Sequence, residues 1–313
     1  MRFTPFLLAL AWFGSVAAAP PAIIDLTGDF TRIAHESEGL PAATRVARFK
    51  AAMATRIPGF YDAARVGAPV AEYDSYIARA LERFPAIEAK FTARAAAVAG
   101  QLAAAQADFA RTFPDSGAQD QPAPPTYLLH SLGEMDGGTR EIGGRTVLVF
   151  GADVIARVHR DDANERPFFQ HELFHVYHEP RFGTCKANWC SLWEEGMATY
   201  VAARLNPGAR DDELLLPAAD MAKIAADLPA AICAMRPLLI SESQADYRKL
   251  FNGGSSLSGL PERSGYFVGY LVAQKLGAGR SLPELAAWSP AEARARIFAV
   301  LDELAPACQD RPR

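Results

Sequence analysis

The sequence has little excess of charge of either sign. In a chain of 313 residues, 32 Lys and Arg stand against 36 Asp and Glu, so the formal net charge is −4. No cluster of basic residues interrupts this balance. Proteins bind nucleic acid mainly through patches of Lys and Arg that contact its phosphates. We therefore expect that nucleic acid is not the main partner.

Long apolar runs are also missing beyond the N-terminus, which argues against a helix that spans a bilayer. Residues 1–18 have the layout of a secretory signal, with Arg2 as its positive start, Phe6 to Phe13 as its apolar core, and small residues from Ser15 to Ala19 at its exit. The exit contains no cysteine, which excludes a lipid anchor there. The sequence predicts an exported protein, periplasmic or secreted, without stable membrane insertion. A signal retained as an anchor is the alternative.

Cysteine is scarce as well, with four residues in the whole chain. Exported proteins fold in oxidising surroundings, so four cysteines suggest two disulfides, for which three connectivities exist. We favour the pairs Cys185–Cys190 and Cys233–Cys308. A structural zinc ion bound by cysteines is the rival interpretation, which export disfavours.

What remains is ordinary globular composition, 50% hydrophobic and 22% charged. Residues 19–120 read as a helical region punctuated by Pro and Gly. Within it, the stretch from Glu72 to Phe109 has apolar residues at helical spacing, and Pro85 is expected to kink or divide it. The apolar positions are Tyr76, Leu81, Phe84, Ile87 and Phe91.

Two strands follow, at Thr126 to His130 and at Arg145 to Phe150, with turn signals at Asp136 to Gly138 and at Gly143 to Gly144. A short helix is expected over residues 152–159, and most of the remaining chain reads as helical. We therefore predict a mainly helical α+β fold, in which a helical N-terminal layer and a small β-sheet precede a helical C-terminal part.

The most informative stretch is His171-Glu172-Leu173-Phe174-His175, which has the pattern HExxH. On a helix, His171 and His175 lie on one face about one turn apart, so a single metal ion can bind both imidazoles. Glu172 points to the flank, where it can reach a water molecule on the metal without being a ligand. Zinc peptidases need this combination of a Lewis acid and a carboxylate that deprotonates water. A buried amphipathic helix whose histidines happen to lie four apart is the alternative.

Local signals support a helix around this motif. Asn164 is a candidate N-cap, Pro167 is tolerated in the first turn, and Pro180 is expected to end the helix. His178 shares the metal-facing side, but it lies about 10 Å along the helix axis from His171 and cannot join the same ion. We expect His178 to support the ligands from outside or to lie at the surface. The predicted buried stripe is Phe169, Leu173, Val176 and Tyr177.

A catalytic zinc site needs three protein ligands and one open position. Downstream, Leu192-Trp-Glu-Glu-Gly-Met-Ala-Thr-Tyr200 reads as a second helix with two adjacent carboxylates. The two segments together resemble the gluzincin peptidases, the superfamily of thermolysin and the zinc aminopeptidases. In the aminopeptidase branch the glutamate directly before glycine is the third ligand. The resemblance thus implies Glu195 as the ligand, with Glu194 as the runner-up.

Within that superfamily the chain is most similar to a family of bacterial proteins described only as zinc-dependent proteases. The similarity covers about residues 126–275 and rests on HELFHVYH and WEEGMATY, and more loosely on the strand pair and a later Gly- and Tyr-rich helix. It implies one zinc ion, a peptide or protein substrate, and a catalytic region over residues 121–313 that forms one compact unit with the N-terminal region.

The sequence departs from thermolysin-like enzymes at Thr199, where they have an aspartate that orients one histidine. A hydroxyl can accept the imidazole N–H, but it does so more weakly than a carboxylate. Gluzincins also use an edge strand to bind an extended peptide, and a Tyr or His of a C-terminal helix to stabilise the oxyanion. Tyr266 is the candidate here, followed by Tyr270 and Arg263, and packing roles for both tyrosines are the alternative. The glycines around them permit close approach of another helix.

These observations predict an exported zinc-dependent hydrolase, in the first place a peptidase. His171, His175 and Glu195 would hold the metal, and Glu172 would act as the general base. A metal-binding or scaffold protein without turnover is one alternative, and a zinc hydrolase of a non-peptide bond is another. Two other histidines, His130 and His159, are expected to be ordinary polar residues, and contact with the substrate is the alternative. The sequence does not decide between exo- and endo-cleavage, nor does it indicate an oligomeric state.

Overall fold

A computed structural model describes residues 22–116 and 124–308, so the signal predicted at residues 1–18 lies outside the described part. The described residues form a mainly helical α+β fold with twelve α-helices and one four-stranded sheet, as predicted. The N-terminal half contains β1 (Ile23–Asp25), α1 (Thr27–Glu36), α2 (Ala42–Arg56), α3 (Val70–Thr112), β2 (Thr126–Leu129), β3 (Gly137–Ile142), β4 (Arg145–Gly151) and α4 (Ala152–Val158). The C-terminal half contains α5 (Arg166–Phe182), α6 (Asn188–Leu205), α7 (Ala218–Ala226), α8 (Leu228–Leu239), α9 (Gln244–Phe251), α10 (Ser264–Leu276), α11 (Leu282–Ala286) and α12 (Pro290–Leu304).

The sheet has the strand order β1-β2-β4-β3. β1 and β4 each pair in parallel with β2, and β3 runs antiparallel to β4 at the edge. The predicted strands β2 and β4 are confirmed, whereas β1 falls in the region predicted to be helical. The prediction of a turn at Asp136 to Gly138 was wrong, because Gly137 and Gly138 pair with Phe150 and Val149 inside β3.

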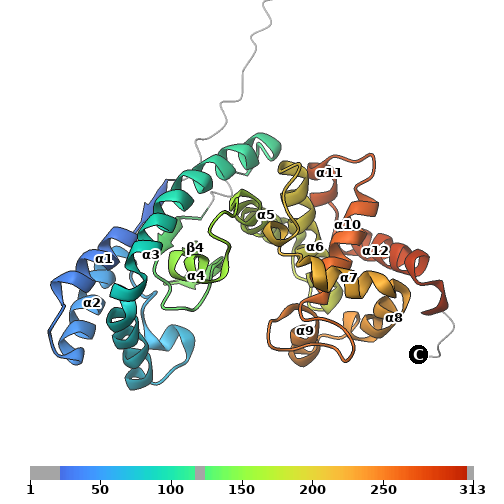
Figure 1. Cartoon of the computed structure of the whole chain (residues 1–313). Helices are drawn as coiled ribbons and strands as arrows, with labels where there is room; N and C mark the ends of the chain where they lie inside the picture. Colours follow the sequence, from blue (N-terminus) through green and yellow to red (C-terminus); the bar gives the residue numbers. More distant parts are fainter. Residues whose placement is uncertain (1–21, 117–123, 309–313) are drawn as a thin grey trace, which may run out of the picture.

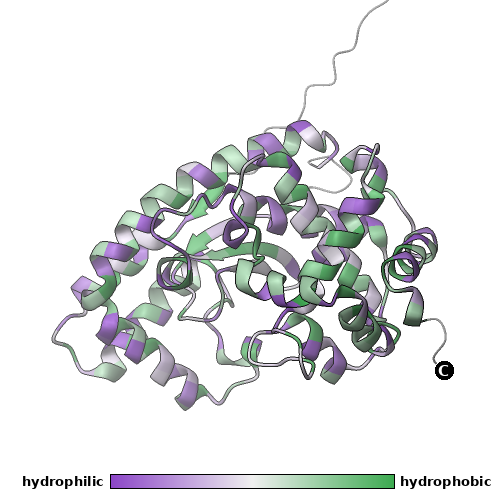
Figure 2. Cartoon of the chain, turned by 45° about the vertical axis from the view of Figure 1, so that its right-hand side comes forward, coloured by the Kyte–Doolittle hydropathy of each residue, from purple (hydrophilic) through white to green (hydrophobic). Residues whose placement is uncertain are grey.

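The long helix α3 lies across the N-terminal half (Figure 1), and its buried side packs with α1 and the sheet in one hydrophobic core. Figure 2 shows that the strands at the centre are mostly hydrophobic while the surrounding helices carry both kinds of residue. Pro85 was expected to kink or divide α3, but it does not divide the helix, which is continuous from Val70 to Thr112. Proline leaves the carbonyl of Leu81 without its helical donor, but the guanidinium of Arg45 donates to that oxygen at 2.7 Å. A side chain of α2 thus supports the helix through its proline.

Helix α5 lies between the two halves of the molecule (Figure 1). Near its start, Phe168 and Phe169 belong to the N-terminal core. Further along, Phe174, Tyr177 and Phe182 belong to the core of the C-terminal half. The helix that carries HExxH is therefore packed by both cores, and its orientation depends on both.

Both ends of α5 lie later in the chain than predicted. The helix begins at Arg166, so Glu165 rather than Asn164 occupies the N-cap position, although the Asn164 side chain accepts a hydrogen bond from the Arg166 N–H at 3.2 Å. Pro180 lies within the last turn, and the helix ends at Phe182. Its C-cap is Gly183, which has a φ of 81° that favours glycine.

Both predicted disulfides are present. Cys185–Cys190 closes the connection between α5 and α6, and Cys233–Cys308 joins α8 to the end of the described chain. Among residues 22–116 and 124–308, no helix combines the length and the hydrophobicity that crossing a membrane requires.

Candidate metal centre

Two adjacent helices bring three donor atoms together. His171 and His175 project from one face of α5, and Glu195 projects from α6. The Nε2 atoms of the two histidines are 3.1 Å apart, and Glu195 Oε2 lies 3.1 Å from His171 Nε2 and 3.3 Å from His175 Nε2. This group could hold a metal ion. The sequence had singled out the same three residues.

The size of this triangle fits a small cation. Ligand atoms about 2.1 Å from a tetrahedral zinc ion lie roughly 3.3–3.4 Å from one another. The three distances are close to this value, and two imidazole nitrogens with one carboxylate oxygen form a donor set found in catalytic zinc sites. Three ligands on one side of an ion leave a fourth position open.

The charges within the triad also favour a cation. Burial alone would raise the pKa of Glu195, but the two histidines beside it hold that pKa well below its usual range. Burial lowers the pKa of His175, yet the Glu195 carboxylate outweighs burial and raises it to about 10. Burial lowers the pKa of His171. The carboxylate thus stays ionised and attracts positive charge to the centre of the triad.

Glu172 lies beside the triad and outside it. Burial raises the pKa of Glu172 to about 7, against the opposing effect of His175. A Cβ placed on Gly138 would lie 3.9 Å from Glu172 Oε2, so the carboxylate faces the backbone of the edge strand β3. A general base works best when its pKa lies near the operating pH, and Glu172 meets this condition.

Two other residues of α6, Glu194 and Thr199, were considered for roles beside the triad. Thr199 Oγ1 lies 3.4 Å from His171 Nδ1, where the hydroxyl can form a long hydrogen bond with the imidazole and help to orient it. Glu194 is not part of the triad. Burial raises the pKa of Glu194 to about 7. The carboxylate next to glycine is therefore the one that joins the histidines.

Helix α10 packs unusually close to α6. A Cβ on Gly196 would lie 2.2 Å from the carbonyl carbon of Gly269, and a Cβ on Gly269 would lie 2.3 Å from the Leu192 carbonyl oxygen. Only glycine leaves room for two helix backbones at this distance. The expectation that the α10 glycines permit close approach of another helix is confirmed at Gly269. Its partner on α6 is Gly196, the residue that follows Glu195.

This contact places Tyr266 beside the triad. The Tyr266 ring is stacked against His171 with centroids 6.1 Å apart, and the Arg263 guanidinium lies 4.3 Å from the centre of the Tyr266 ring. Tyr270 faces Tyr200 instead, with ring centroids 6.4 Å apart. Of the three residues predicted to stabilise an oxyanion, Tyr266 and Arg263 lie near the metal ligands, whereas Tyr270 is directed elsewhere.

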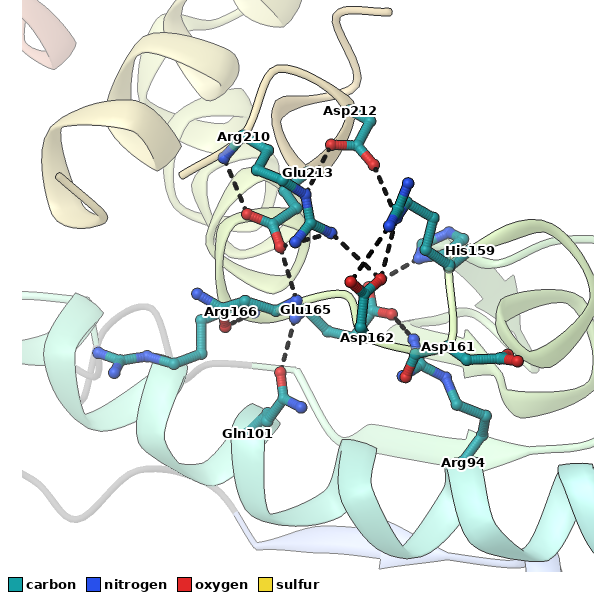
Figure 3. Close-up of polar contacts among 12 residues, drawn as sticks. Arg94, Gln101, His159, Asp161, Asp162, Glu165, Arg166, Arg210, Asp212 and Glu213 are labelled. Atoms are coloured by element: carbon teal, nitrogen blue, oxygen red, sulfur yellow. Dashed lines mark hydrogen bonds and ion pairs between the residues drawn. The ribbon is translucent and has the colours of Figure 1, made fainter. Parts of the chain in front are cut away.

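A network of charged groups holds the beginning of α5 (Figure 3). The buried Glu165 carboxylate pairs with Arg94 of α3 and lies 2.7 Å from His159 Nδ1, and its backbone N–H donates to Gln101 at 2.6 Å. His159 Nε2 lies 3.2 Å from Asp136, the residue before β3. His159 is therefore a connector between α5 and the edge strand, a role that no local sequence pattern indicated.

The prediction that His178 supports the metal ligands or lies at the surface was wrong. It is fully buried, and neither ring nitrogen has a hydrogen-bond partner among the described residues. Its ring is stacked between Phe174 and Phe182, with centroids 4.9 and 4.8 Å away. Burial therefore lowers the pKa of His178 to about 3. His178 serves as a packing residue, and it lies neither at the surface nor in a hydrogen bond to a metal ligand.

A pocket of about 440 Å³ adjoins the site and is lined by residues of both halves, including Asp136, Phe168, Arg263 and Phe267. The charges of Asp136 and Arg263 also act on the pKa of Glu172, which places this pocket next to the general-base candidate.

Tyr247 of α9 is a further neighbour of the triad. Burial and the charge of Glu195 raise its pKa to about 12. Nothing in the sequence around Tyr247 marks it, because only the fold brings α9 to the triad.

Comparison with protein-family models, with curated protein sequences and with solved structures gives no match for this chain.

Proposed function

We propose that this protein is an exported, zinc-dependent peptidase of the gluzincin type. The observation that carries the proposal is the triad of His171, His175 and Glu195, together with the Glu172 carboxylate that lies beside it and is not a ligand. A purely structural metal site has no use for a general base. The two disulfides and the secretory pattern of residues 1–18 support export.

In the proposed reaction, a zinc ion held by the triad would polarise the scissile carbonyl and acidify the attacking water. Glu172 accepts a proton from that water and later passes it to the leaving amine. Its raised pKa suits both steps, because a carboxyl group with a pKa of about 7 exchanges protons readily near neutral pH. Tyr266 is the proposed hydrogen-bond donor to the oxyanion, and Arg263 on its ring favours negative charge there.

An extended peptide is the substrate that the surroundings favour. The strand β3 forms an edge of the sheet, and its backbone at Gly138 faces Glu172. A peptide added to this edge would carry its own backbone past the general base. The pocket beside Asp136 and Arg263 lies where a substrate side chain could enter.

The test is the substitution Glu172→Gln in the mature protein, assayed on a broad peptide library. Gln keeps the size of the side chain but cannot accept a proton. Positioned acid–base catalysis is worth about 10²–10⁴-fold, so hydrolysis should fall by at least that order while bound zinc stays at the parental level. His171→Ala is the matched control and should lose zinc and activity together. Parental cleavage rates in Glu172→Gln would refute the general-base assignment. If the parent and Glu172→Gln both hold zinc and neither cleaves a peptide, a metal-binding protein without turnover would be favoured.

A further inference from the structure

A second pocket lies in the N-terminal half, in a groove between α3 and α4. It has a volume of about 580 Å³, and its lining shares no residue with the metal triad or with the pocket beside it. Ligand pockets typically measure about 300–1,000 Å³. The residues that matter here are Tyr76, Arg79, Arg83, Ile87, His130 and Arg157.

The walls of this groove are partly apolar. Tyr76 and Ile87 were counted in the apolar pattern of α3, yet they are 44% and 41% exposed. Leu81, Phe84 and Phe91 of the same helix are fully or almost fully buried. The apolar pattern thus extends beyond the core, and the two exposed side chains border the groove.

The rim of the groove is positively charged. Arg79, Arg83 and Arg157 line it, and within the described residues none of the three has a carboxylate within salt-bridge distance. The Arg79 guanidinium lies 4.5 Å from the centre of the Tyr76 ring. Asp153 also lines the groove, but its carboxylate accepts hydrogen bonds from the backbone N–H groups of Ser131 and Gly133 at 2.6 and 2.7 Å. The charges that can reach a ligand are therefore mainly positive.

The buried side chain of His130 also lines the groove. His130 is only 4% exposed, and its ring is stacked on Phe30 with centroids 3.9 Å apart. Its Nδ1 accepts the Leu132 N–H at 3.1 Å and lies 3.4 Å from Asp153 Oδ2 without a hydrogen bond to it. An Nδ1 that accepts this N–H leaves the proton of the neutral ring on Nε2. Burial lowers the pKa of His130 against the opposing charge of Asp153, which favours the neutral ring. No residue in the described ranges pairs with Nε2.

We propose that this groove binds a small amphiphilic carboxylate. Its apolar body packs on Tyr76 and Ile87, and its carboxylate lies between the arginine guanidinium groups and the His130 Nε2–H. Guanidinium groups pair with carboxylates through two parallel hydrogen bonds, so the unpaired arginines match this head group. The site is independent of the metal centre.

Isothermal titration calorimetry of the mature protein tests the proposal, with decanoate as the probe. Butyrate has the same head group without the long chain, and decan-1-ol has the chain without the charge. Decanoate should bind at one site per molecule, at least about tenfold more tightly than either control compound. No binding, several equivalent sites, or equal binding of decan-1-ol would overturn the proposal.

Variants locate the site. The double substitution Arg79→Gln and Arg83→Gln should weaken decanoate binding by at least about tenfold, since charge-assisted hydrogen bonds are lost. Arg294→Gln is the matched control, because Arg294 is an exposed arginine near an aromatic ring, Phe298 on α12, outside the groove. It should bind like the parent. Both changes lie at exposed positions, so the proteins should fold.

His130→Phe keeps the stacked ring and removes the Nε2–H donor, together with the Nδ1 acceptor of the Leu132 N–H. It should weaken decanoate binding by about tenfold while butyrate and decan-1-ol stay weak. If Arg79→Gln/Arg83→Gln binds decanoate as tightly as the parent, the groove is not the site.

Discussion

Replacing Gly196 with alanine should force α6 away from α10 and disturb the metal centre. The added Cβ would lie 2.2 Å from the carbonyl carbon of Gly269, whereas nonbonded carbon atoms pack about 3.5–4.0 Å apart. Because the obstructing atoms are backbone, no side-chain rotation relieves the contact, and the helices must separate by more than about 1 Å. Overpacking typically costs about 1–3 kcal/mol. We expect Gly196→Ala to reach the upper end of that range.

Gly100→Ala provides the matched control. Gly100 also lies inside a helix, but a Cβ there would meet no atom within 4 Å. Alanine should stabilise this position by about 1 kcal/mol, since glycine is the poorer helix former. The same chemical change at two helical glycines should therefore have opposite effects.

The assays are urea unfolding of both variants and competition for zinc with a chelator. Because Glu195 directly precedes Gly196, displacement of α6 should also weaken zinc binding, by about 10–100-fold as for other changes around metal ligands. Gly100→Ala should bind zinc like the parent. A Gly196→Ala protein that unfolds at the parental urea concentration and keeps its zinc would refute the close packing of α6 on α10.

Three further results are expected. Glu195→Ala should abolish zinc retention in a dialysis assay while Glu194→Ala keeps most of it, and the reverse outcome would reassign the third ligand. Replacing Cys233 and Cys308 by alanine should lower the free energy of unfolding by up to about 4.5 kcal/mol, the loop-entropy value for a sequence separation of 75 residues, and an unchanged urea midpoint would contradict this. The neutral, buried His178 has a pKa of about 3 when folded and 6.5 as an unperturbed group, so its contribution is complete above pH 6.5 and is lost toward pH 3 at about 1.4 kcal/mol per pH unit. His178→Phe should reduce this loss in acid unfolding curves, and identical pH dependence in both proteins would argue against it.

The parts of the site that were predictable depend on short-range patterns. The i, i+4 spacing of His171 and His175 places both side chains on one face as soon as the segment is helical. The helix that carries Glu195 follows after a short connection. Strands β2 and β4 were predicted because their apolar residues alternate or run together between turn signals.

The parts that were missed depend on distant partners. β1 is three residues long and is a strand because β2 pairs with it. Gly137 and Gly138 have the composition of a turn, but the hydrogen bonds of β4 extend them into β3. Pro85 was expected to kink or divide α3; the helix is undivided, and Arg45 of another helix supplies the missing donor. In each case the deciding contact joins segments that no local pattern connects.

The parallel pairing of β1 with β2 has a consequence for folding kinetics. Ile23 pairs with Thr126, and the connection between the two strands contains α1, α2 and α3. Closing so long a loop is entropically unfavourable, and contacts between distant segments slow folding. The three helices form from local contacts, while β1 has no partner until β2 is in place. In pulse-labelled hydrogen exchange during refolding, the amide hydrogens of β1 should therefore gain protection later than those of α3.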